Sequence, residues 1–113
     1  MKNWYRNLAT RYTSFAEDVQ VLNVVSDLEK AKNLFEVDYQ TAINHLYRAL
    51  ILLDYISDDP KWKMRLRELL RLRETVASLI AIEIPYGSIE QIIRAALQMV
   101  PKAYRLIRNI PPE

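Results

Sequence analysis

The side chains of this chain that could do chemistry are few and widely separated. His45 is the only histidine and there is no cysteine, which excludes disulfides and thiolate zinc sites. No glutamate lies three or four residues from His45, so the Glu-x-x-His pairing of di-iron bundles is absent. A Ser-His-Asp triad would have to use the same histidine, and no nucleophile-elbow pattern is present. We therefore expect no catalytic residue, no cofactor and no metal, and predict that the protein is not an enzyme.

Basic residues form the most distinctive charged pattern. Residues 1–59 carry six Lys/Arg and nine Asp/Glu, whereas residues 60–113 carry ten Lys/Arg and five Asp/Glu. Rows of cations at helical spacing can follow a phosphate backbone or steer an acidic partner. The predicted contacts are basic residues of the third helix and the C-terminus: Lys61, Lys63, Arg65, Arg67, Arg71, Lys102, Arg105 and Arg108.

The same basic residues have a simpler interpretation as a solvated face. They would then pair with Asp54, Asp58, Glu68 or acidic residues of the first helix, as charges on neighbouring helix surfaces often do. The sequence favours this interpretation over nucleic-acid binding.

A second candidate surface is aromatic. Residues 1–15 contain four aromatic and three basic residues and no acidic one. Such a segment can lie on a membrane, stack on bases or exchange into a neighbouring subunit; its regular spacing favours a cover over the core. The predicted interface residues are aromatic or aliphatic: Trp4, Tyr5, Leu8, Tyr12, Tyr47, Ile51 and Tyr55.

Helices must position these side chains, because apolar residues recur every three or four positions. The first helix is predicted from Trp4 to Phe35, either kinked near Ser14 or Ser26, which open capping-box patterns, or unbroken with its first turns overhanging the bundle. The second is predicted from Tyr39 to about Ser57, with Asp38 as its cap.

The third helix is predicted from Pro60 to about Glu83, because Asp59-Pro60 is a strong start signal. Within it, Trp62, Leu66, Leu69 and Val76 are expected to point inward. Ser88 to Gln91 is a capping box that opens the fourth helix, which Pro101 should kink or interrupt. The prediction is an all-α, antiparallel four-helix bundle in one domain, 1–113, with residues 1–15 as an arm that can protrude.

The second helix is apolar over more than one face, so it needs cover on several sides. A central place in one bundle would provide this cover, as would a subunit interface, which we favour slightly. Residues 38–52 resemble the second helix of a tetratricopeptide repeat and the matching helix of microtubule-interacting-and-trafficking domains. Both families bury small alanines and bind peptides between helices. No second repeat follows, so we interpret the resemblance as convergence on close packing.

The sequence therefore predicts a non-catalytic bundle that self-associates and binds a protein partner, as an adaptor or small structural subunit. The alternative is a nucleic-acid-binding accessory subunit that contacts phosphates through the basic residues. The N-terminus carries no signal-peptide core and no apolar stretch is long enough to span a bilayer. We expect a cytoplasmic protein by default and do not expect peripheral membrane contact.

Overall fold

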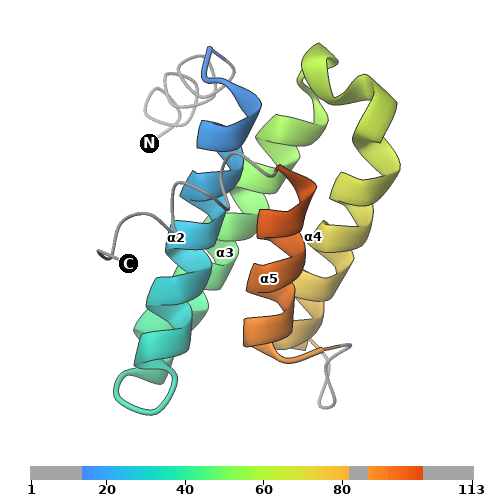
Figure 1. Cartoon of the computed structure of the whole chain (residues 1–113). Coiled ribbons are helices and arrows are strands. Elements are labelled where there is room, and N and C mark those ends of the chain that lie inside the picture. Colours follow the sequence, from blue (N-terminus) through green and yellow to red (C-terminus); the bar gives the residue numbers. More distant parts are fainter. Residues whose placement is uncertain (1–13, 82–86, 101–113) are drawn as a thin grey trace, which may run out of the picture.

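The computed structural model describes residues 14–81 and 87–100, and these residues form an all-α bundle (Figure 1). The elements in chain order are α2 (Glu17–Leu34), α3 (Tyr39–Ser57), the 3₁₀-helix η1 (Pro60–Arg65), α4 (Leu66–Ala81) and α5 (Ile89–Met99). The described ranges contain no strand. The predicted helical fold class is confirmed.

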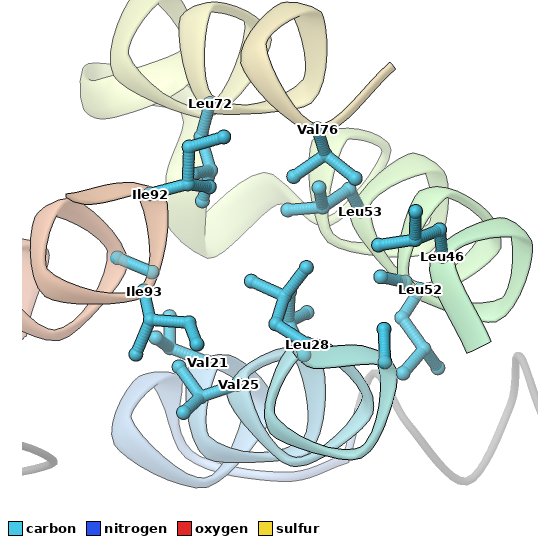
Figure 2. Packing of buried hydrophobic residues seen from close by; sticks show 14 of the residues in the cluster. Val21, Val25, Leu28, Leu46, Leu52, Leu53, Leu72, Val76, Ile92 and Ile93 are labelled. Carbon is cyan, nitrogen blue, oxygen red and sulfur yellow. The ribbon is translucent and has the colours of Figure 1, made fainter. Parts of the chain in front are cut away.

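The four α-helices close around one core. α3 packs against α2 and α4, while α5 packs against the same two helices from the other side. Figure 2 shows side chains from all four helices meeting in the centre, among them Leu28, Leu53, Val76 and Ile92. Each contributes apolar surface that water does not reach, which is the main favourable contribution to folding.

α3 lies within this bundle with most of its apolar residues covered. Leu46, Ala49, Leu53 and Ile56 are fully buried, and α2, α4 and η1 of the same chain all contact this helix. The bundle itself therefore covers most of the apolar surface that sequence analysis assigned, by a slight preference, to a subunit interface.

Two predicted helix starts are confirmed. Asp38 accepts hydrogen bonds from the backbone N–H of Thr41 at 3.2 Å and from its hydroxyl at 2.6 Å, and these bonds lower the pKa of the Asp38 carboxyl. Ser88 and Gln91 form a reciprocal capping box at the start of α5. Both caps satisfy backbone donors that a helix leaves without an internal partner.

The first helix is shorter than an unbroken helix from Trp4 would be. Ser14 to Ala16 form a turn and a bend, and α2 begins at Glu17 with Ala16 as a cap that makes no side-chain bond. Of the alternatives left open, a helix unbroken from Trp4 is excluded because residues 14–16 are not helical, which agrees with a break near Ser14, and α2 continues through Ser26 without a break. The two acidic residues of its first turn favour the start at Glu17, because they face the positive end of the helix dipole.

Several predictions lie outside the described residues. They are the course of the chain over residues 1–13, the end of the third helix near Glu83 and the break at Pro101. Within the described ranges, α5 ends at Met99, two residues before that proline.

The predicted helix start at Pro60 with Asp59 as its cap is confirmed, but the first turns are not α-helical. Pro60 begins a 3₁₀-helix, and α-helical geometry starts only at Leu66. A 3₁₀-helix has three residues per turn instead of 3.6, so the four-residue spacing from Lys61 to Arg65 and from Lys63 to Arg67 does not define α-helical rows. Leu66, expected to point inward, is 37% exposed.

Close packing along α3 leads to a stability prediction. Ala42, Ala49 and Ile56 recur every seven residues on one side of α3, and all are fully buried. We expect Ala49→Leu to lower the free energy of unfolding by about 1–3 kcal/mol, because added methylenes in a packed core force strained rotamers. Urea denaturation measures this change. The exposed Ala95 of α5 provides the control, since Ala95→Leu should stay within about 0.5 kcal/mol of wild type.

Candidate binding surface on η1 and α4

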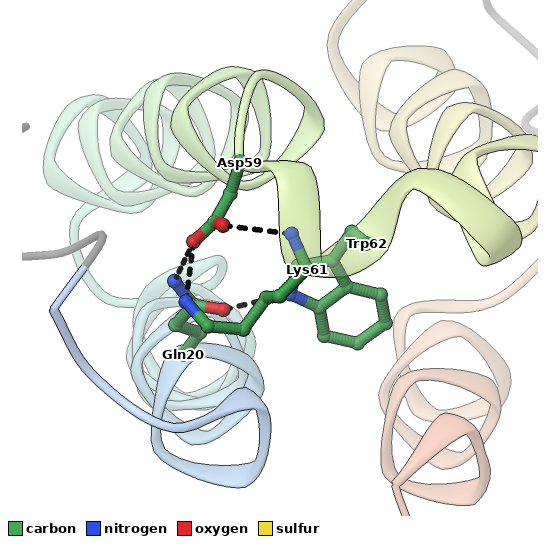
Figure 3. A network of polar contacts seen from close by, with 4 residues as sticks. All are labelled: Gln20, Asp59, Lys61 and Trp62. Atoms are coloured by element: carbon green, nitrogen blue, oxygen red, sulfur yellow. Dashed lines mark hydrogen bonds and ion pairs between the residues drawn. The ribbon is translucent and has the colours of Figure 1, made fainter.

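A buried hydrogen-bond network fixes η1 on the bundle (Figure 3). The indole N–H of Trp62 donates to Gln20 Oε1 at 2.7 Å, and Gln20 Nε2 donates to Asp59 Oδ2 at 2.9 Å. Trp62 and Gln20 are fully buried, and Asp59 is 6% exposed. Since Gln20 lies on α2 and the other two residues begin η1, the network joins two segments that are distant in sequence.

Asp59 also starts η1. Its carboxylate accepts from the backbone N–H of Lys61 at 3.0 Å and from Lys61 Nζ at 2.6 Å. Burial acts to raise the pKa of Asp59, but the hydrogen bonds from Lys61 and Gln20 and the charge of Lys61 outweigh it, so the pKa is lowered. The folded protein therefore favours ionised Asp59.

Several of the basic residues are already paired within the chain. Lys61 is bound to Asp59. Arg65 makes two bonds to Glu68, at 2.9 and 3.2 Å, and its guanidinium lies 5.3 Å from the Trp62 ring centroid. The bonds to Arg65 lower the pKa of the Glu68 carboxyl. Lys61 and Arg65 are therefore members of intramolecular ion pairs, as the simpler interpretation of the basic residues expected.

A further cation of α4 that was not among the predicted site residues is paired in the same way. Arg73 Nε donates to Asp54 Oδ1 on α3 at 2.6 Å, and this hydrogen bond raises the pKa of Arg73. Asp54 was one of the acidic residues expected to pair with the basic face, and it joins α4 to α3.

The other three predicted cations of this segment face solvent. Lys63, Arg67 and Arg71 are exposed, and none of them forms an ion pair with another described residue. Arg67 and Arg71 lie one helical turn apart on α4, and Lys63 precedes them on η1. Within residues 14–81 and 87–100, these three charges are therefore solvated and not paired.

Aliphatic side chains lie beside these cations. Met64 is 93% exposed, Leu70 is 44% exposed and Leu66 is 37% exposed. Leu66 and Leu70 are one turn apart on α4, as are Arg67 and Arg71, and each leucine is followed directly by an arginine. The two four-residue rows are therefore neighbouring ridges of the helix surface. We call these residues together the η1–α4 face: Lys63, Met64, Leu66, Arg67, Leu70 and Arg71.

The predicted interface residues of α3 are less exposed than those of the η1–α4 face as a group. Tyr47 is 52% exposed, Ile51 is half-buried, and Tyr55 is half-buried against the core. Other predicted site residues lie outside the described ranges: Trp4, Tyr5, Leu8, Tyr12, Lys102, Arg105 and Arg108.

Two buried polar residues of α2 were not predicted from the sequence. Gln20 and Asp27, seven residues apart, both face the interior, whereas the apolar Val19 beside Gln20 is 39% exposed. His45 Nδ1 lies 3.0 Å from Asp27 Oδ1, and Arg48 Nε lies 3.5 Å from the same oxygen. Both residues are in register with the buried valines of α2, and this position could have indicated their burial. Their hydrogen-bond partners come from other elements, however, and local periodicity does not reveal such partners.

Neither His45 nor any other described residue belongs to a metal-binding group of three or more ligands.

An open hollow of about 250 Å³ lies beside α2 and α5, with Glu29, Lys32, Glu90 and Arg94 in its lining. It is smaller and more charged than a usual pocket for a small molecule. Of the helices in the described ranges, none is long and apolar enough to cross a bilayer.

Comparisons with known proteins found no match for this chain among family models, curated proteins or solved structures. A function for this chain is therefore inferred from its own residues and their geometry.

Proposed function

We propose that this protein is a non-catalytic helical bundle that acts by self-association and by binding another protein, as an adaptor or small structural subunit of a larger assembly. The observation that carries the proposal is the η1–α4 face, where exposed aliphatic side chains lie beside cations that have no described intramolecular partner. Protein interfaces combine an apolar centre with charges that orient the partner.

The two activities use different surfaces in this proposal. The η1–α4 face takes an acidic partner, and Met64, Leu66 and Leu70 lose contact with water there. Self-association uses the exposed Tyr47 and the half-exposed Ile51, which are one turn apart on α3. Tyrosine is favoured at interfaces because it has a large apolar body and a polar end.

Nucleic-acid binding is the second candidate, and the exposed Lys63, Arg67 and Arg71 favour it. Cations at this spacing can contact phosphates without reading bases. The aliphatic row has no role on such a backbone, because bases stack on aromatic side chains.

Sedimentation equilibrium together with retention on duplex DNA distinguishes the two functions. We expect dimers or larger species at both low and moderate salt, and no DNA retention that falls steeply with salt. In the Tyr47→Ser variant, the equilibrium between oligomer and monomer should shift toward monomer relative to wild type. A different outcome would contradict the proposed function and support the second candidate. In that outcome the protein is a monomer that binds DNA with a steep salt dependence. The Arg67→Glu/Arg71→Glu variant then loses DNA binding but keeps its helical circular dichroism.

A further inference from the structure

We propose that the segment bound on the η1–α4 face is an acidic amphipathic α-helix of another protein; this inference rests on the proposed function. The leucine row and the arginine row on α4 each repeat after four residues. Helices pack by fitting such four-residue ridges into the grooves of another helix. A partner helix with Leu or Ile in one four-residue row and Glu or Asp in the adjacent row has the matching pattern.

The charges of this surface also define a direction. The exposed cations Lys63, Arg67 and Arg71 are followed along α4 by Glu74, which is exposed and without an ion pair among the described residues. A bound helix would place carboxylates opposite the cations and a basic residue opposite Glu74. Charge complementarity of this kind fixes the orientation of a partner more than it adds affinity.

Lipid and nucleic acid fit this surface less well. Glu74 lies on α4 with the cations and makes no ion pair with a described residue, so it would repel an anionic membrane surface or a phosphate backbone, whereas a partner helix can place a basic residue opposite it. The nearly fully exposed Met64 gains nothing from contact with phosphates, whereas an apolar residue of a partner helix would cover it.

A second copy of this chain does not supply the partner helix from its described residues. Its exposed acidic residues outside α4 that make no ion pair with a described residue are distributed over different segments: Glu36 and Asp38 between α2 and α3, Asp58 after α3 and Glu90 on α5. No single described helix has an acidic row, and the sequence of residues 1–13 and 101–112 contains no Asp or Glu, so we infer that the occupant is a different protein.

Fluorescence anisotropy with a synthetic peptide tests the inference. The probe is a helical peptide of about 20 residues, long enough to be helical by itself, with Leu and Glu in adjacent four-residue rows and Lys at the end that meets Glu74. The control peptide has the same composition but scrambled rows. We expect the matched peptide to bind and the scrambled peptide to bind at least about tenfold more weakly.

Protein variants then locate the binding site. Arg67→Glu and Leu70→Asp should each weaken binding of the matched peptide about tenfold, since one reverses a charge contact and the other puts a charge into an apolar contact. Lys30→Glu is the matched control, because it makes the same charge change on an exposed residue of α2, and it should leave binding unchanged. Circular dichroism confirms that each variant is folded.

The outcomes separate this inference from the proposed function. Three results overturn the helix inference: equal binding of the two peptides, wild-type affinity in Arg67→Glu, or no binding at all. They leave the proposed self-association, which sedimentation equilibrium tests separately, unaffected. Tighter binding to phosphatidylcholine/phosphatidylserine vesicles or to duplex DNA, with loss in Arg67→Glu, overturns both.

Discussion

Trp62→Ala is expected to lower the free energy of unfolding by about 4 kcal/mol, because it leaves a large cavity in a packed interior. Trp62 is the largest fully buried side chain of the described core. Its loss also removes the donor that bonds Gln20 Oε1 at 2.7 Å, and an unsatisfied buried polar group has a free-energy cost of its own. Chemical denaturation followed by far-ultraviolet circular dichroism measures the change.

Two comparisons make the Trp62 prediction specific. Trp62→Phe keeps most of the ring but lacks the indole N–H, so it should cost about 2 kcal/mol, between wild type and the alanine variant. Met64→Ala changes a residue of the same 3₁₀-helix that is 93% exposed, and it should stay within about 0.5 kcal/mol of wild type. Equal stability of Trp62→Ala and Met64→Ala would show that the indole does not hold η1 on the bundle.

Asp59→Ala is expected to have the second largest effect, a loss of about 3 kcal/mol. The substitution removes the cap of η1, which contributes about 1 kcal/mol. It also leaves the amide of the fully buried Gln20 without the acceptor that now lies 2.9 Å away, which costs about 1–3 kcal/mol. The neighbouring Asp58 is exposed, so Asp58→Ala serves as the control and should cost less than about 0.5 kcal/mol.

The stabilisation by Asp59 should depend on pH in a definite direction. Because folding lowers the pKa of Asp59, the unfolded chain binds the proton more tightly than the folded protein. The contribution is therefore fully present above the unfolded pKa, about 3.9, and is lost as the pH falls through the folded pKa. Asp59→Asn should show a smaller acid-induced loss of stability below about pH 4 than wild type. Parallel curves for the two proteins would contradict this assignment.

The two substitutions act on one network, so their effects should not add. Trp62 and Asp59 both bond to Gln20, and residues with a shared partner show coupling of about 0.5–3 kcal/mol in double-mutant cycles. Additive effects in Trp62→Ala/Asp59→Ala would indicate that Gln20 finds other partners.

Signals that depend on a few neighbouring residues were sufficient to predict much of the fold. Asp38, Asp59 and Ser88 all cap the elements that follow them, because a cap needs only a side-chain acceptor and the next backbone N–H groups. The helical periodicity of α3, from Tyr39 to Ser57, is equally local.

The features that the sequence did not predict depend on contacts between distant segments. Pro60 and Asp59 predicted a helix start, but the buried bonds among Trp62, Gln20 and Asp59 accompany a 3₁₀-helix there. For the same reason, Gln20 and Asp27 are buried on α2 while Val19 is partly exposed. Periodicity ranks residues by hydrophobicity, whereas burial of a polar group depends on whether a partner from another helix can satisfy it.

The candidate site shows the same division. The sequence by itself determined which residues are basic, and it predicted that Lys63, Arg67 and Arg71 lie along a helical segment. The pairs Lys61–Asp59 and Arg65–Glu68 are local, since their residues lie two and three positions apart. Only the tertiary structure decided that Arg73 pairs with Asp54 of α3, that the other three predicted cations of this segment face solvent, and that Met64, Leu66 and Leu70 stay exposed. Charge is a property of each residue, but pairing and exposure depend on which groups the folded chain brings within reach.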